Sequence, residues 1–458
     1  MSRNTSGAGG WRFALVMLHA VGLSCADDDG GEPQGTGDTS TTTTGALTEP
    51  SGEQASTTAV ASGTSSGTGQ ERSTGPAAST DEGDTGETTG GEAGCFVRLP
   101  AEDRARKVVV GQPYDDAGAQ AAGYSVLELS ASGELSGPSA TFEMRRSVYG
   151  PIRFTPDGRV GIAHQSARAN VDEGNSFGVF EIDEDGEVQV RDEGFEGSYY
   201  PGGFSLSHDG ETLWALDSAF RDVGGGVFEV SVGCDGALTE HKQAVSGRLT
   251  QTLDFTTDGH ALIGAHVYAG ADPAADAFLF DWGRSENPIA AADLFGHEDF
   301  IIGASALTAD ERLFALSDVS TFSAAPNRVA FGRVESDALI QDGTIDIFDP
   351  FEMVASPFGD IVLVGSGEGN AIYILDYDAG ASPALTLRGE LSYVGTAPAL
   401  PGKATMVRHG TLEGLVLWTE NTGVRRIQFL GDGEVVDLGL FSLGAGFTAI
   451  PGGIGVQP

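Results

Sequence analysis

One hairpin motif recurs about every 50 residues along the chain. In each copy a short turn, usually of the form Thr/Ser-x-Asp-Gly, separates two apolar runs, and the second run ends in a polar residue. Asp-Gly pairs suit such turns because glycine accepts positive φ. The five copies occupy Phe154–His164, Leu206–Asp217, Phe255–His266, Leu307–Ser317 and Ala355–Ser366. A regular period of this length indicates a repeat protein in which each unit packs against the next.

A second series of turns alternates with the first. Two hairpins per repeat require four strands per repeat, which is the composition of a β-propeller blade. The series has seven members, at Ala131–Gly133, Asp185–Gly186, Asp235–Gly236, Glu286–Asn287, Ser336–Asp337, Ala379–Gly380 and Asp432–Gly433. The sequence therefore predicts an all-β fold, a seven-bladed β-propeller with four antiparallel strands in each blade.

The first blade lacks its innermost strand at the N-terminal end. Arg106–Gln112 has the pattern of a second strand, with no first strand before it. The pattern of the missing strand recurs near the C-terminus, in Phe447–Gly453. We expect the C-terminal strand to join blade one and close the ring, which leaves no free inner edge.

The turn and the strand after it resemble the lactonase-type (YVTN) propeller repeat. The residues that carry the resemblance are Pro156–His164 and Leu213–Asp217, within a repeat region of roughly residues 105 to 455. The resemblance implies the propeller fold. It leaves the activity open, because this repeat occurs in enzymes, adhesive domains and scaffolds. Lactonase-type enzymes use polar residues that line the central channel, but no catalytic set matches here residue by residue.

The first 25 residues have the pattern of an export signal. Arg3 and Arg12 precede a short apolar run, Phe13–Leu23, which is too short for a permanent membrane span. The run ends in Gly22–Cys25, which resembles the lipobox of bacterial lipoproteins and makes Cys25 the expected lipidation site. The alternative is ordinary signal cleavage and a freely secreted protein. Either route predicts export across the inner membrane, the first to a lipid-anchored position in the cell envelope or at the surface.

Residues 26 to 94 have the composition of a disordered linker. The segment is rich in Ser, Thr, Gly and acidic residues, and Leu47 and Val60 are its only large aliphatic residues. Such a chain buries too little apolar surface to offset the entropy lost on folding. It resembles the tether of bacterial surface lipoproteins, and the propeller domain is then expected over residues 95 to 458.

The chain is strongly acidic, with a formal net charge of −41. A surface of this sign repels phosphate backbones, so nucleic acid is excluded as a partner. The charge favours solubility; an acidic face that collects cations is the alternative. We expect a monomer whose partners are the membrane, through the anchor, and a protein or small molecule on one propeller face.

Polar residues end the second strand of several repeats, and more follow in the loops behind. If the blades are equivalent, these side chains form a ring on one face and are candidates for a binding site. A divalent cation could bind His164, His266 and Asp217, since imidazole and carboxylate both suit such ions. Strand ends that merely meet solvent are the alternative. The candidate ring consists of Gln112, His164, Arg168, Asp217, Arg221, His266, Tyr268, Asp318 and Glu420.

Three cysteines are present, and lipidation would use Cys25. The two others, Cys95 and Cys234, form an even pair in an exported protein, so we expect a disulfide between them. Two unpaired thiols, one of them buried, are the alternative.

These patterns predict an exported, lipid-anchored propeller that binds a ligand or partner, or acts as a scaffold. The alternative is a lactonase-like hydrolase or cyclase that uses polar residues at the channel mouth. No cofactor is required by any motif, and a divalent cation is the one candidate.

Overall fold

A computed structural model describes residues 94–100, 103–114, 120–144, 148–165, 177–183, 185–192, 201–217, 225–266, 275–296, 301–319, 326–448 and 451–458. The predicted export signal, Cys25 and almost all of the predicted tether lie outside these residues. None of the described residues forms a helix long and apolar enough to span a membrane.

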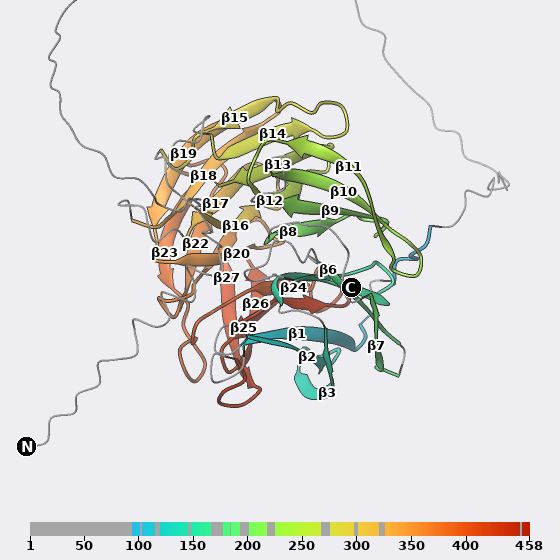
Figure 1. Ribbon diagram of the computed structural model, residues 1–458. Helices are drawn as coiled ribbons and strands as arrows, with labels where there is room; N and C mark the ends of the chain where they lie inside the picture. The colour runs from blue at the N-terminus through green and yellow to red at the C-terminus, as the bar shows by residue number, and fades with distance from the viewer. Residues whose placement is uncertain are drawn as a thin grey trace, which may run out of the picture. The chain divides into compact units, whose positions relative to one another are not determined.

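The described residues form an all-β structure of seven four-stranded antiparallel sheets arranged around a central axis (Figure 1). This is the predicted seven-bladed β-propeller. Blade one contains β28 (Ile454–Val456), β1 (Arg106–Tyr114), β2 (Gln120–Leu129) and β3 (Leu135–Glu143). Blade two contains β4 (Val148–Phe154), β5 (Val160–Gln165), β6 (Phe177–Ile182) and β7 (Val188–Asp192). Blade three contains β8 (Pro201–Leu206), β9 (Thr212–Asp217), β10 (Gly226–Val232) and β11 (Leu238–Ser246).

The remaining four blades repeat the same order from the axis outward. Blade four contains β12 (Thr250–Phe255), β13 (His260–Ala265), β14 (Ala277–Asp281) and β15 (Ala290–Ala292). Blade five contains β16 (Ile302–Leu307), β17 (Leu313–Asp318), β18 (Arg328–Glu335) and β19 (Ala338–Asp346). Blade six contains β20 (Pro350–Ala355), β21 (Ile361–Ser366), β22 (Ala371–Tyr377) and β23 (Leu385–Glu390). Blade seven contains β24 (Ala404–Met406), β25 (Leu415–Glu420), β26 (Gly423–Gly431) and β27 (Glu434–Ser442).

The turn between the first two strands of a blade has the same internal bond in several repeats. The hydroxyl of Thr155 donates to Asp157 over 2.6 Å, and Thr308 donates to Asp310 over 2.7 Å. Gly158 follows in the first copy with φ of 72°, the conformation that glycine adopts without strain. In the fourth copy Glu311 occupies the glycine position with φ of 59°. The repeated sequence motif thus builds the same turn in successive blades.

The C-terminal strand closes the ring, but not at the predicted residues. β28 pairs antiparallel with β1, through Val108 with Val456 and Val110 with Ile454. The prediction placed this strand at Phe447–Gly453. Phe447 instead packs in the core between blades seven and one, within a turn that contains Gly444 and Gly446 at positive φ. Positive φ interrupts an extended strand, so pairing begins only where the chain is extended again.

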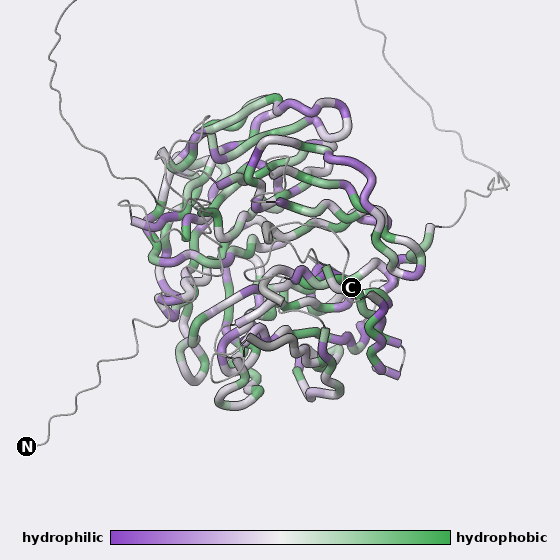
Figure 2. The backbone as a smooth tube through the Cα atoms, viewed as in Figure 1, coloured by the Kyte–Doolittle hydropathy of each residue, from purple (hydrophilic) through white to green (hydrophobic). Residues whose placement is uncertain are grey.

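The apolar core is divided into seven clusters, each between two neighbouring sheets. Figure 2 shows hydrophobic residues along the strands of the blades. Each blade buries both faces against its neighbours, and burial of apolar surface there holds the ring together. This packing lies between the blades and does not fill the space around the central axis. That space is lined by side chains of the innermost strands.

A disulfide attaches the start of the folded domain to blade three. Cys95 and Cys234 are bonded across 139 residues, with their Cα atoms 4.8 Å apart, and they are the pair that the cysteine count predicts. The amide of Cys95 also donates to Glu211 over 2.7 Å, and Phe96 packs in the core between blades two and three. The segment before β1 is therefore fixed to the propeller by covalent, polar and apolar contacts together.

Candidate functional site

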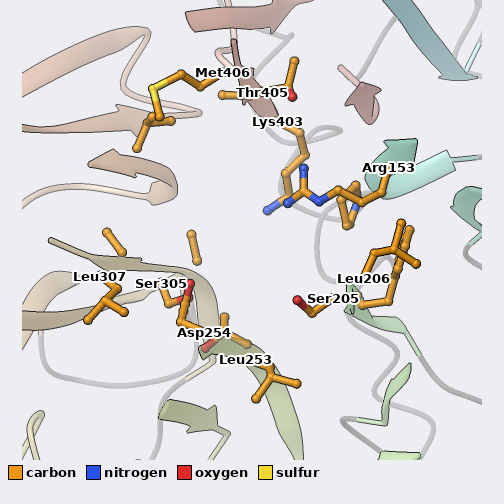
Figure 3. A pocket seen from close by; sticks show the side chains of 18 of the residues that line it. Arg153, Ser205, Leu206, Leu253, Asp254, Ser305, Leu307, Lys403, Thr405 and Met406 are labelled. Atoms are coloured by element: carbon orange, nitrogen blue, oxygen red, sulfur yellow. The ribbon is translucent and has the colours of Figure 1, made fainter. Parts of the chain in front are cut away.

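A cavity of about 1090 Å³ follows the axis of the propeller. Residues of all seven innermost strands or of the segments directly beside them line it. Figure 3 shows polar side chains of several blades directed into it, among them Arg153, Ser205 and Lys403, while Leu206 and Leu307 turn away. The channel is therefore a polar cavity inside a ring of apolar cores.

A lysine and a glutamate meet in this cavity. The Lys403 ammonium lies 2.9 Å from a carboxylate oxygen of Glu352. It also donates to the carbonyl of Gly303 over 3.2 Å and lies 4.6 Å from the centre of the Phe351 ring. These contacts hold the charged end of Lys403 at the channel wall.

An aspartate on the neighbouring wall is bonded to a serine of the next blade. The Ser305 hydroxyl donates to Asp254 over 2.5 Å. Burial raises the pKa of Asp254, and this hydrogen bond and the positive charges of Arg408 and Arg153 oppose the rise. Asp254 is thus a carboxylate held in a partly desolvated position within reach of two guanidinium charges.

Arg153 brings a positive charge to the same region. Its side chain is exposed, and the surface that it exposes faces the channel. Because the channel walls surround Arg153 and displace bulk water, desolvation lowers its pKa; the like charge of Arg408 lowers it further, while Glu352 and Asp254 oppose the change. We call Arg153, Asp254, Ser305, Glu352 and Lys403 the channel cluster.

His164 lies in the cavity wall without a hydrogen bond. Its side chain is 1% exposed, and both ring nitrogens are buried without a partner. The ring contacts Phe177 with 5.6 Å between ring centres and packs against Gly150. Burial lowers the pKa of His164 to about 3, helped by the charge of Lys403, so the imidazole is neutral at physiological pH.

His266 is a second buried histidine of the cavity wall. Its Nδ1 accepts a hydrogen bond from the Ile302 amide over 2.9 Å, which leaves the proton on Nε2. Burial lowers its pKa to about 3. The described residues contain no group of three or more His, Cys, Asp or Glu side chains placed to hold a metal ion, so His164, His266 and Asp217 do not form one.

The remaining described members of the predicted ring lie in the propeller wall and do not line the cavity. Gln112 donates to the Phe447 carbonyl over 2.7 Å, and Glu420 is paired with the buried Arg425. Asp217 and Asp318 are fully buried. Second strands are one strand removed from the axis, so most of their side chains point between blades. Arg168, Arg221 and Tyr268 lie outside the described residues.

The residues of the channel cluster were not among the sequence candidates. A signal for part of the cluster exists in the sequence, because Arg153 stands between Ile152 and Phe154. Asp254 stands likewise between Leu253 and Phe255. A single charge inside an apolar strand just before the Asp-Gly turn marks a position on the innermost strand that faces the axis.

Comparison with solved structures supports the fold. The chain is similar to a periplasmic gluconolactonase of Pseudomonas aeruginosa, with a TM-score of 0.52 and 17% identity over 77% of this chain and 99% of that one. It is also similar to a putative 6-phosphogluconolactonase of Bacteroides uniformis, with a TM-score of 0.54 and 13% identity over 77% of this chain and 99% of that one. No protein-family model and no curated protein matches the sequence. These likenesses support the seven-bladed propeller fold, and the activity has to be argued from the site.

Proposed function

We propose that this propeller binds a small polar molecule in its central channel, at the channel cluster. The observation that carries the proposal is the convergence of charged side chains from four blades on one cavity: Arg153 from blade two, Asp254 from blade four, Glu352 from blade six and Lys403 from the start of blade seven. Concave sites with a few convergent polar groups are the usual form of ligand sites.

The cluster adds a few polar contacts between blades, such as the Lys403–Glu352 pair and the Ser305–Asp254 hydrogen bond, to a ring that apolar contacts already hold. Apolar contacts between sheets hold the blades together, and the channel residues lie outside those contacts. Charged groups that are removed from bulk water are costly unless they are paired. Apolar residues in the channel would avoid this free-energy cost, so the presence of charged residues there favours a role in ligand recognition.

A binding assay with two matched variants tests this proposal. Ligand-observed NMR with a collection of sugars, sugar acids and lactones identifies a ligand for the full chain. Lys403→Gln should then weaken that ligand at least about tenfold, through loss of a charge-assisted contact. Lys242→Gln is the control, because Lys242 forms an exposed pair with Glu229 on the outer strands. Absence of any ligand, or equal effects of both variants, would contradict a channel site.

Lactone hydrolysis is the second candidate function, favoured by Asp254 beside Arg153 and Arg408. Asp254 is suited to take a proton from water that attacks the lactone carbonyl carbon. The guanidinium groups are suited to stabilise the oxyanion that forms. The ring C–O bond then breaks, and the proton passes from Asp254 to the departing alkoxide. The shared fold of the gluconolactonase and the putative 6-phosphogluconolactonase is consistent with this chemistry.

Acid release from D-glucono-1,5-lactone distinguishes hydrolysis from binding. A lactonase should open this ring faster than the spontaneous reaction does, and Asp254→Asn should return the rate to the spontaneous value. A chain that binds the ligand but leaves the lactone rate unchanged is a binding protein.

The proposed location is the bacterial cell envelope, with a lipid on Cys25 and residues 26 to 94 as the tether. The Cys95–Cys234 disulfide supports export, because such bonds persist in oxidising compartments. One of the similar propellers, the gluconolactonase of Pseudomonas aeruginosa, is periplasmic. Cys25→Ser should move the protein from the membrane fraction to the soluble fraction. Unchanged fractionation and an unmodified N-terminal mass for the natural protein would refute lipidation and leave the channel site untouched.

A further inference from the structure

The cavity and the chain differ in the sign of their charge. The whole chain has 25 basic and 66 acidic residues. Among the described residues that line the cavity, five are basic and three are acidic. The basic ones are Arg98, Arg106, Arg153, Lys403 and Arg408, and the acidic ones are Asp254, Glu311 and Glu352. A positively charged hollow inside a strongly acidic protein raises the local concentration of anions.

The innermost charges leave an excess of one cation. Arg153, Arg408 and Lys403 face Asp254 and Glu352. Arg408 lies close enough to Arg153 for its charge to lower the pKa of Arg153, and Lys403 is already paired with Glu352. One unit of positive charge in a partly desolvated site is balanced best by one negative charge.

The same cavity offers groups that suit hydroxyls. Ser205 points into the channel, and Ser305 and Asp254 are already bonded to each other on its wall. His164 takes no part in this set, because both of its ring nitrogens are buried away from the cavity surface. A ligand hydroxyl both donates and accepts, so it suits a serine hydroxyl and a carboxylate on one wall.

We propose that the channel ligand is a hydroxylated monocarboxylate, with its carboxylate at Arg153, Arg408 and Lys403 and its hydroxyls at Ser205 and Asp254. This inference rests on the channel site proposed above. A neutral ligand would leave the extra cation unbalanced. A phosphate dianion would be repelled by Asp254 and Glu352 on the same wall.

Three compounds with one ring and different charges test the inference. D-galactose, D-galacturonate and D-galactose 6-phosphate carry zero, one and two negative charges at the same end of the molecule, and the three glucose analogues form a second series. Binding to the full chain is measured by ligand-observed NMR and calorimetry at low ionic strength. We expect the uronate to bind at least about tenfold more tightly than the neutral sugar and the phosphate, and to weaken as salt is added.

Variants then locate the carboxylate. Arg153→Gln and Arg408→Gln should reduce uronate affinity to that of the neutral sugar. Arg388→Gln is the control, because Arg388 pairs with Asp376 in an exposed position on an outer strand. Ser205→Ala should weaken the uronate and the neutral sugar alike, since it removes a hydroxyl contact and no charge.

Each adverse outcome identifies what has failed. Equal binding of uronate and neutral sugar overturns the charge inference and keeps the channel site. Tighter binding of the phosphate overturns the monocarboxylate and identifies a dianion ligand. Uronate binding that neither arginine variant weakens places the carboxylate elsewhere. If no compound of either sugar series binds, and none of the larger collection of sugars, sugar acids and lactones binds either, the proposed function itself is overturned.

Discussion

Replacement of Arg425 by methionine should destabilise the propeller strongly without touching the channel. Arg425 is completely buried in blade seven. Its guanidinium pairs with Glu420 and Asp437, the second over 2.7 Å, and donates to the Thr396 carbonyl over 2.8 Å. Methionine fills most of the space but leaves two carboxylates buried without a counter-charge.

The structure gives the size of the effect. Glu420 and Asp437 are 1% and 6% exposed, so water does not replace the lost partner. Removal of one member of a buried ion pair typically costs about 3 to 5 kcal/mol. Loss of the contact between Arg425 and the Tyr393 ring, 5.3 Å away, adds roughly 0.5 to 1 kcal/mol. We expect Arg425→Met to lower the free energy of unfolding by about 4 kcal/mol.

The loss should depend on pH in a defined direction. Burial raises the pKa of Glu420, and Arg425 opposes this rise, so the variant lifts the folded-state pKa further. A carboxyl whose folded pKa exceeds its unfolded value near 4.3 binds its proton more tightly in the folded state. The free energy of unfolding of the variant should therefore recover as the pH falls from about 7 toward 4.

Denaturant unfolding of the full chain at several pH values measures these effects. Arg388→Met is the matched control, since its pair with Asp376 is exposed and should contribute at most about 1 kcal/mol. Adding Glu420→Gln to Arg425→Met should recover part of the loss. A cost for Arg425→Met no larger than that of the control would refute the reasoning. The reasoning would also be refuted if the Glu420→Gln variant kept the stability of the natural protein and lost ligand binding.

Three further predictions concern the scaffold. Replacing both Cys95 and Cys234 by alanine should lower the free energy of unfolding by roughly 2 to 5 kcal/mol relative to the oxidised protein, because the disulfide closes a loop of 139 residues. A change below about 1 kcal/mol would show that the disulfide is dispensable for stability. Gly365→Ala should cost about 1 to 3 kcal/mol by the same measurement, since a Cβ there would lie 2.4 Å from the Trp418 ring; unchanged stability would mean that the ring can move aside. Burial raises the pKa of Asp276 to about 7, so stability should fall as the pH rises from about 4 to 7; Asp276→Asn should flatten that stretch of the pH profile, and an unaltered profile would contradict the assignment.

The sequence by itself determined the repeat and hence the ring. Turn motifs such as Thr155–Gly158 are local, because their hydrogen bonds and positive φ involve neighbouring residues only. Their period gives the number of strands, and the missing first strand of blade one predicts closure by the C-terminus. The exact closing residues, Ile454–Val456, depend on pairing with Val108 and Val110, which are far away in the chain. The local sequence pattern alone predicted the closing strand too early in the chain, at Phe447–Gly453.

Only the tertiary structure decided which polar residues face the axis. His164 and Asp217 occupy the same position in their repeats, yet His164 lines the channel and Asp217 does not. The difference arises from neighbouring strands and blades that the repeat pattern does not specify. Arg153 and Lys403 likewise become part of one site because seven blades close around a common axis. Charges distant in sequence share that cavity only once the ring is complete, so their combined field is a property of the fold.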